Sequence, residues 1–307
     1  MMSIEAILKE AGFTVSEACY SRPSCFDYAA RKDERVVFVK IQPDIGNLSL
    51  KDSQELKTIS EFFSAASILV GEKTRDKPLE DDTIYSRYEV LAFTPKTLES
   101  TMLRKIYPFI QASPGGYYVK IDGETIRRRR QELGLSAGEM AKMIGISRRT
   151  LYGYERGMAK ASVTATYNLM STLGIPVVKA LDIFETPQRK RKCFLLTTAR
   201  QAIAKNNILQ KIFRKFSRYR VTAVKKAPFD FVISVPKGKM RIMGGVAGNE
   251  EPELDRRVDE ILSVSRVVQA HPILVTDGLD PPREDINCIR SDEFSMIRNL
   301  EDLIVRI

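Results

Sequence analysis

The middle of the chain, residues 122–186, carries apolar residues at helical spacing in short stretches that end at glycine. A first helix is predicted over Gly123–Leu133, because Gly134 is a typical residue to end one. A second helix is predicted to begin after Ser136. In the stretch Ser136-Ala137-Gly138-Glu139, the serine caps the helix while the glutamate reaches back to the serine amide.

A third helix is predicted over Arg148–Arg156, with Ser147 as its N-cap. Gly145 supplies the tight turn between the second and third helices, and a small Ala141 stands four residues earlier, where two helices cross closely. This spacing predicts a helix-turn-helix. We also expect a fourth helix near Val163–Leu173 and a short fifth helix that ends near Phe184.

On either side of this centre, a weak repeat indicates two related α/β domains. Residues 24–30 resemble residues 227–233, and each copy follows an amphipathic helix. Each copy then continues with a strand, a helix and a matching apolar strand. In the N-terminal copy, the expected strand, helix and strand are Val36–Ile41, Leu48–Ala65 and Ile68–Val70. In the C-terminal copy they are Met240–Met243, Leu254–Gln269 and Ile273–Val275.

Charge separates the centre from the ends. The chain of 307 residues has a formal net charge of +10. By segment, the balance is −2 for residues 1–119, +5 for 120–184, +12 for 185–226 and −5 for 227–307. A basic centre suits a polyanionic partner, nucleic acid first.

Composition narrows the classes of chemistry. The four cysteines are scattered and His271 is the only histidine, which disfavours a zinc site or a cysteine–histidine nucleophile pair. No apolar run approaches the ~18 residues of a membrane span, so we expect no membrane association and a cytoplasmic location. The sequence has neither a glycine-rich loop for phosphates nor a cluster of metal ligands, so we expect no cofactor.

The central pattern resembles the Cro/C1 (XRE-like) repressor family in the segments 135–141, 145–151 and 154–157. The resemblance implies that Arg130 and Glu155 form a buried ion pair between the first and third helices. Ala137 stands where the family usually has a glutamine that contacts DNA, which removes one contact. The expected DNA-binding residues are Ser147, Arg148, Arg149, Thr150, Tyr152, Gly153, Arg156, Arg128 and Lys160.

The flanking domains resemble the restriction-endonuclease-like fold. Active members of that superfamily hold magnesium with an Asp on one strand and a Glu-x-Lys on the next. Asp27 and Lys40 fit this pattern, whereas Phe38 occupies the Glu position. Asp230 has its expected counterparts near Arg241 and Met243. We therefore expect vestigial sites without cleavage; Asp27 and Asp230 could also be local hydrogen-bonding groups of a turn.

The whole chain resembles an archaeal family of helix-turn-helix transcriptional regulators. The expected fold class is an α+β multidomain protein, with an all-α Cro/C1-type domain between two restriction-endonuclease-like α/β domains. The expected boundaries are an N-terminal nuclease-like domain at 1–106, a linker and short strand at 107–121, the helix-turn-helix domain at 122–186, and a basic helix with the second nuclease-like domain at 187–307.

These patterns predict a sequence-specific regulator that binds double-stranded DNA as a homodimer. Two alternatives stay open: a metal-dependent nuclease targeted by the central domain, and an adaptor that binds RNA or protein through the basic segment 189–226. For the basic run Arg127–Arg130, a solvated helix face is an alternative to phosphate contact. The basic amphipathic helix after Leu209 could also lie on an anionic membrane, although nonspecific phosphate contact suits a DNA-binding chain better.

Overall fold

The computed structural model describes residues 2–184, 203–204, 206–234, 240–248, 251–277, 285–297 and 303. The chain divides into two compact units. The arm unit comprises residues 1–42, 46–69 and 184–307, and the reader unit comprises residues 43–45 and 70–183. Among the described residues, no helix is long and apolar enough to cross a membrane.

The N-terminal arm, residues 2–69 of the arm unit, is a small sheet with a helix packed against it. Its strands follow the order β1-β2-β3-β4, and the pairs β1–β2 and β2–β3 are antiparallel. Buried Phe38 of β3 packs on Phe63 of α2. The elements are α1 (Ile4–Glu10), β1 (Thr14–Val15), β2 (Tyr28–Lys32), β3 (Arg35–Ile41), the 3-10 helix η1 (Ile45–Asn47), α2 (Leu50–Phe63) and β4 (Ala66–Val70).

The C-terminal arm, the described residues from 203 onward, is a five-stranded mixed sheet in the order β12-β13-β14-β15-β16. The pairs β12–β13 and β13–β14 are antiparallel, and the pairs β14–β15 and β15–β16 are parallel. The elements are α9 (Asn207–Lys215), β12 (Arg220–Ala223), β13 (Phe231–Ser234), β14 (Arg241–Ala247), α10 (Leu254–Val268), β15 (His271–Thr276), β16 (Asn287–Arg290) and α11 (Ser291–Met296).

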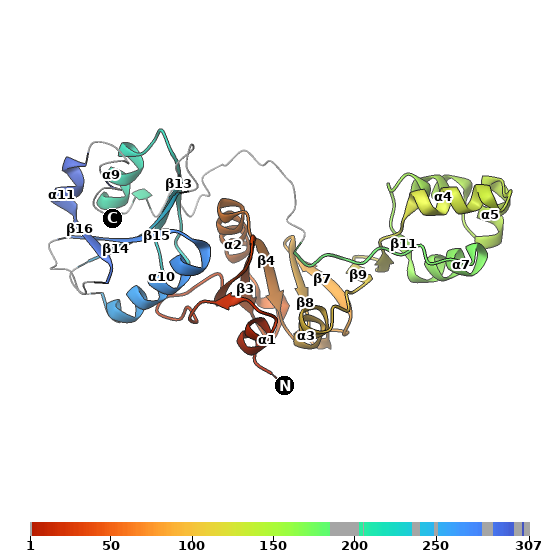
Figure 1. The fold of residues 1–307 in the computed structure, drawn as a ribbon, viewed down its shortest axis with the longest axis horizontal. Helices are drawn as coiled ribbons and strands as arrows, with labels where there is room; N and C mark the ends of the chain where they lie inside the picture. The colour runs from red at the N-terminus through yellow and green to blue at the C-terminus, as the bar shows by residue number, and fades with distance from the viewer. Residues whose placement is uncertain are drawn as a thin grey trace. The chain divides into compact units, whose positions relative to one another are not determined.

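The reader unit contains a small mixed sheet and a cluster of four helices, of which Figure 1 labels α4, α5 and α7. Apolar side chains of all four helices share one core, including Ile126, Met140, Leu151 and Leu169. The elements are β5 (Lys73–Thr74), β6 (Lys77–Pro78), β7 (Thr83–Arg87), β8 (Val90–Phe93), α3 (Pro95–Leu103), β9 (Ile110–Ser113), β10 (Gly116–Val119), α4 (Gly123–Glu132), α5 (Ala137–Ile144), α6 (Arg148–Glu155), β11 (Ala161–Ser162) and α7 (Val163–Leu173).

Two sequence expectations need correction here. The predicted fifth helix is absent from residues 174–184, where Val178 instead forms an antiparallel bridge with Ile121. The Val177 carbonyl accepts from the Asp122 amide at 2.8 Å, so backbone contacts join this segment to the start of α4. The segment 107–116, read as linker from its prolines and glycines, contains β9, which pairs with β10 in a hairpin.

Candidate nucleic-acid interface

The turn between α5 and α6 has the geometry that the sequence predicts. Gly145 ends α5 in the left-handed region at φ 78°, where a side chain would be strained. The capping box of α5 is formed in both directions: the Ser136 hydroxyl accepts from the Glu139 amide at 3.2 Å, and the Glu139 carboxylate accepts from the Ser136 amide at 2.8 Å. Hydrogen bonds from the Ser136 side chain and the Ser136 amide to the Glu139 carboxylate lower the pKa of Glu139.

The predicted ion pair between α4 and α6 is present and nearly buried. The Arg130 guanidinium donates to both carboxylate oxygens of Glu155, at 2.6 and 3.1 Å, and to the Leu135 carbonyl at 2.9 Å. The hydrogen bond with Glu155 raises the pKa of Arg130. A bidentate pair with little solvent fixes the two helices in one relative orientation.

Helix α6 presents one polar face to solvent. Ser147 caps it by accepting from the Thr150 amide at 3.0 Å, and the two hydroxyls also contact each other at 2.8 Å. Tyr152 is 47% exposed, while Leu151 and Tyr154 point into the core. The structure therefore brings together the expected residues of the third helix: Ser147, Arg148, Arg149, Thr150, Tyr152, Gly153 and Arg156.

The two other expected contacts lie outside α6. Arg128 is exposed on α4, with its Nε 3.9 Å from the Glu132 carboxylate. Lys160 is exposed after α6 and donates to the side-chain carbonyl of Gln111 on β9. Neither group makes a buried contact, so both are accessible to a polyanion.

The sequence pattern does not show where the Arg148 side chain lies. A Cβ placed on Gly138 would lie only 2.5 Å from the Arg148 guanidinium, so this side chain lies directly against the start of α5. Gly138 leaves the room for that approach. The glycine inside the capping box was the available signal, although the box alone does not indicate which side chain would use the space.

In the N-terminal arm, Asp27 is engaged by protein groups. Its Oδ1 accepts from the Lys40 ammonium at 2.9 Å, and its Oδ2 accepts from the Ile41 amide at 2.5 Å. Phe38, at the expected Glu position, is fully buried. The structure thus brings Asp27 and Lys40 together as an ion pair.

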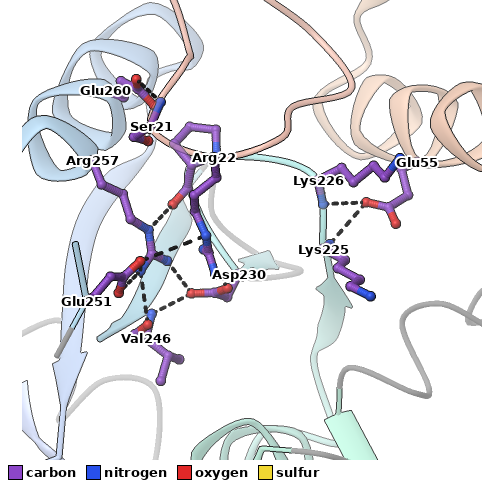
Figure 2. A network of polar contacts seen from close by, with 11 residues as sticks. Ser21, Arg22, Glu55, Lys225, Lys226, Asp230, Val246, Glu251, Arg257 and Glu260 are labelled. Atoms are coloured by element: carbon purple, nitrogen blue, oxygen red, sulfur yellow. Dashed lines mark hydrogen bonds and ion pairs between the residues drawn. The ribbon is translucent and has the colours of Figure 1, made fainter. Parts of the chain in front are cut away.

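In the C-terminal arm, arginines surround Asp230 (Figure 2). The Arg22 guanidinium donates to its Oδ1 at 2.9 Å, and buried Arg257 donates to its Oδ2. Arg257 also binds the Glu251 carboxylate at 2.6 Å and the Val246 carbonyl at 3.1 Å. A guanidinium therefore lies beside both carboxylates of this site.

The backbone corrects the expected counterparts of Asp230. The Asp27 amide donates to the Val39 carbonyl, and the Asp230 amide donates to the Gly244 carbonyl, each at 2.8 Å. Val39 therefore corresponds to Gly244, so the metal-site positions after Asp230 are Met243 and Gly245 rather than Arg241 and Met243. Neither a thioether nor a glycine supplies the hard oxygen ligand that magnesium prefers.

The residues of both arms do not fit a magnesium site. Mg²⁺ is usually held by carboxylate oxygens in near-octahedral geometry. Asp27 has Lys40 and a backbone amide as partners, and Asp230 has two arginines. Within the described ranges, no group of three or more His, Cys, Asp or Glu residues is arranged to hold a metal ion.

The two arms contact each other through reciprocal hydrogen bonds that the sequence reading missed (Figure 2). Buried Glu55 of α2 accepts from the amides of Lys225 and Lys226, at 3.0 and 2.7 Å. Buried Glu260 of α10 accepts from the amides of Tyr20 and Ser21, both at 2.7 Å. The offset that superposes the two Ile-Leu-Val strands also superposes Glu55 on Glu260.

The basic segment 189–226 lies partly outside the described residues, because 185–202 and 205 are not described. Its described helix α9 buries Ile208, Leu209 and Ile212 in the core of the C-terminal arm. Lys211 and Arg214 are exposed on the same helix. The predicted amphipathic helix is therefore confirmed, with its apolar face packed on this arm.

Two segments of the chain match models of known protein families. Residues 1–108 match the family model described as a PD-(D/E)XK superfamily domain, and residues 126–179 match the model described as helix-turn-helix.

Full-length relatives carry the name "Putative HTH-type transcriptional regulatory protein". The relative from Methanococcoides burtonii is 30% identical over 97% of this chain and 92% of its own length. The relative from Methanocella arvoryzae is 31% identical with the same two coverages, and that from Pyrococcus furiosus is 27% identical over 98% of this chain and 94% of its own length. The chain belongs to this archaeal family of HTH-type transcriptional regulatory proteins.

Proposed function

We propose that the chain is a sequence-specific DNA-binding transcriptional regulator whose helix α6 enters the major groove. The observation that carries this proposal is the exposed polar face of α6, held at a fixed angle to α4 by the Arg130–Glu155 pair. In helix-turn-helix proteins, the N-terminal residues of the second helix of the motif, which is α6 here, contact base edges. The names of the relatives support the same function.

Within this proposal, Arg148 and Arg149 read base edges, because a guanidinium can bind guanine with two parallel hydrogen bonds. Thr150, Tyr152 and Gly153 line the same face, and Arg156 lies at its end. The hydroxyl of Ser147 and the cations of Arg128 and Lys160 contact phosphates beside the groove, which positions α6 without selecting sequence.

The test is selection of duplex DNA from a random pool by the full chain, followed by affinity measurements on the selected and a scrambled duplex. The double variant Arg148→Ala with Arg149→Ala is expected to lose most of the preference for the selected duplex. Each bidentate contact contributes ~1–3 kcal/mol of discrimination. The matched control is Arg104→Ala with Lys105→Ala, which removes two positive charges elsewhere in the reader unit. A preference that survives the first variant would refute the role of α6.

The regulator is proposed to bind as a homodimer, because one such reader covers only a half-site. The selected sequences test this: a two-fold-related motif, with two chains per duplex by light scattering, is the expected result. A motif without symmetry that binds one chain would contradict it.

The arms are proposed to be a related pair of nuclease-like domains that do not cleave DNA and need no cofactor. The shared backbone hydrogen bonds at Asp27 and Asp230 support their relationship. The buried Phe38 at the Glu position and the two arginines that bind Asp230 support the lack of cleavage. Supercoiled plasmid incubated with the chain in Mg²⁺ or Mn²⁺ should stay intact. Cutting that is lost on Asp27→Ala would establish an active nuclease instead.

A further inference from the structure

A row of cations crosses the C-terminal arm beside the end of α2. Strand register places Arg220 of β12 opposite Ser234 of β13, and Ser234 opposite Arg241 of β14. Directly opposed residues of antiparallel strands project from the same face. The two arginines therefore share a face, about 9.5 Å apart at their backbones, which is two strand spacings. A hydroxyl lies between them.

The N-terminal arm holds both side chains in place. The Arg220 guanidinium lies 4.9 Å from the ring centre of Phe62 and donates to the Glu61 carbonyl at 3.4 Å. The Arg241 guanidinium lies 5.5 Å from the ring centre of Phe63. Stacking on aromatic faces restricts two otherwise flexible side chains while leaving their N–H groups available to a ligand.

A third guanidinium, that of Arg31, lies near enough to Arg241 to act on it electrostatically. Arg31 of β2 donates to the Asp33 carbonyl at 2.9 Å, and its charge acts on Arg241. Partial burial lowers the pKa of Arg241, and the charges of Arg31 and Arg220 lower it further. In the part of the chain that the structure describes, these three groups contact carbonyl oxygens and rings, and no carboxylate pairs with them.

Three like charges held close together raise the free energy of the fold unless an anion joins them. The α2 carbonyl end offers only a partial negative charge. We propose that Arg31, Arg220 and Arg241, with the Ser234 hydroxyl, form a phosphate-binding site of the arm unit that takes a backbone phosphate of duplex DNA. Planar guanidinium groups suit phosphate because each can present two parallel N–H donors. The site would add sequence-independent affinity to a chain whose other unit reads sequence.

The test uses the full chain and a random-sequence duplex, so that it does not depend on an operator. Affinity is measured by fluorescence anisotropy across a salt series for the wild type and for Arg220→Gln with Arg241→Gln. Loss of phosphate contacts should reduce the slope of log Kd against log salt by ~0.9 per contact, or about 1.8 for two contacts. Affinity at low salt should fall by about tenfold or more, because one charge-assisted hydrogen bond already corresponds to that factor.

Three controls keep the result specific. Lys9→Gln with Arg266→Gln removes the same two charges from exposed positions of the arm unit and should leave the slope unchanged. Arg220→Lys with Arg241→Lys should retain most of the slope, because the charge stays. The glutamine variant should also preserve the ratio between operator and random DNA, which separates this site from the α6 interface.

An unchanged slope and affinity in the glutamine variant would overturn the proposal. Inorganic phosphate, titrated into the same proteins by calorimetry, distinguishes the source of the anion. If phosphate binds the wild type and not the glutamine variant while DNA affinity is unaltered, the site takes a small phosphorylated ligand and the DNA assignment is wrong.

Discussion

At the scale of single residues, the Arg130–Glu155 pair constrains how α4 and α6 pack in the reader unit. Both side chains are almost fully removed from solvent, and the arginine satisfies two carboxylate oxygens and one carbonyl. Such a pair need not add net stability over an apolar substitute, but removing one partner leaves an uncompensated buried charge. The pair therefore favours one angle between α4 and α6 over others, whether or not it adds to the free energy of unfolding.

Arg130→Ala should destabilise the reader unit by roughly 3–5 kcal/mol, because it strands the Glu155 carboxylate. The exposed neighbour provides the control: Arg128→Ala should change stability by less than about 0.5 kcal/mol. Urea titration followed by hydrogen exchange in α4 and α6 measures both changes within the full chain. Similar effects from the two substitutions would show that the pair is not a distinct constraint.

Gly138→Ala separates stability from recognition. A methyl group there meets the far end of the flexible Arg148 side chain, which can move, so the fold should lose little. Alanine in place of a helical glycine could even stabilise α5, by up to about 1 kcal/mol. Operator binding should nevertheless weaken by about 1 kcal/mol or more as Arg148 is displaced. A melting temperature paired with an operator titration checks this, and unchanged operator affinity would contradict it.

At the scale of elements, the crossing of α4 and α6 depends on a backbone contact. A Cβ on Gly123 would lie 2.2 Å from the Tyr154 carbonyl oxygen, and neither backbone can yield without moving a helix. Gly123→Ala should therefore destabilise the reader unit by roughly 1–3 kcal/mol. Gly153→Ala is the contrasting substitution, because its Cβ meets only the Ala159 methyl at 3.4 Å. That variant should be neutral or more stable by up to about 1 kcal/mol in thermal unfolding. Destabilisation of equal size in both variants would count against the steric explanation.

The same elements show what a sequence pattern can predict. The bounds of α7, Val163–Leu173, were predicted from strong helical periodicity between Ser162 and Gly174. The fifth helix was wrong because Pro176 and the β-branched pair Val177 and Val178 also suit an extended strand, and pairing with Ile121 decided between them. Short strands such as β9 are set by a partner strand, which local periodicity does not reveal.

At the scale of the whole molecule, the site chemistry was predictable where two side chains of opposite charge meet. The Arg130–Glu155 pair followed from the pattern of the Cro/C1 family, whereas the nuclease pattern gave the positions of Asp27 and Lys40 but not their ion pair. The reciprocal contact between the arms did not, since Glu55 and Glu260 bind backbone amides, and every residue except proline has one. The available sequence signal was that Glu55 and Glu260 are separated along the chain by the same number of residues as the two Ile-Leu-Val strands.

The contact between the arms gives the last prediction, because Cys25 lies at it and reports whether it is closed. The Cys25 amide donates to the Lys226 carbonyl at 2.9 Å, and the thiol is fully buried. Burial raises the pKa of the Cys25 thiol well above its usual value, and the nearby Glu55 charge raises it further. At pH 8 very little of it is the reactive thiolate, so alkylation of the native chain should be slow.

Glu260→Ala leaves the amides of Tyr20 and Ser21 without their acceptor, which should weaken the contact between the arms by about 3 kcal/mol. Alkylation of Cys25, followed by peptide mass spectrometry, should then accelerate by up to ~100-fold, while Asp255→Ala, exposed on the same helix, should leave the rate near the wild-type value. An unchanged rate in Glu260→Ala would mean that the arms are held together by their apolar contacts, such as Phe26 with Phe229, and not by the glutamates.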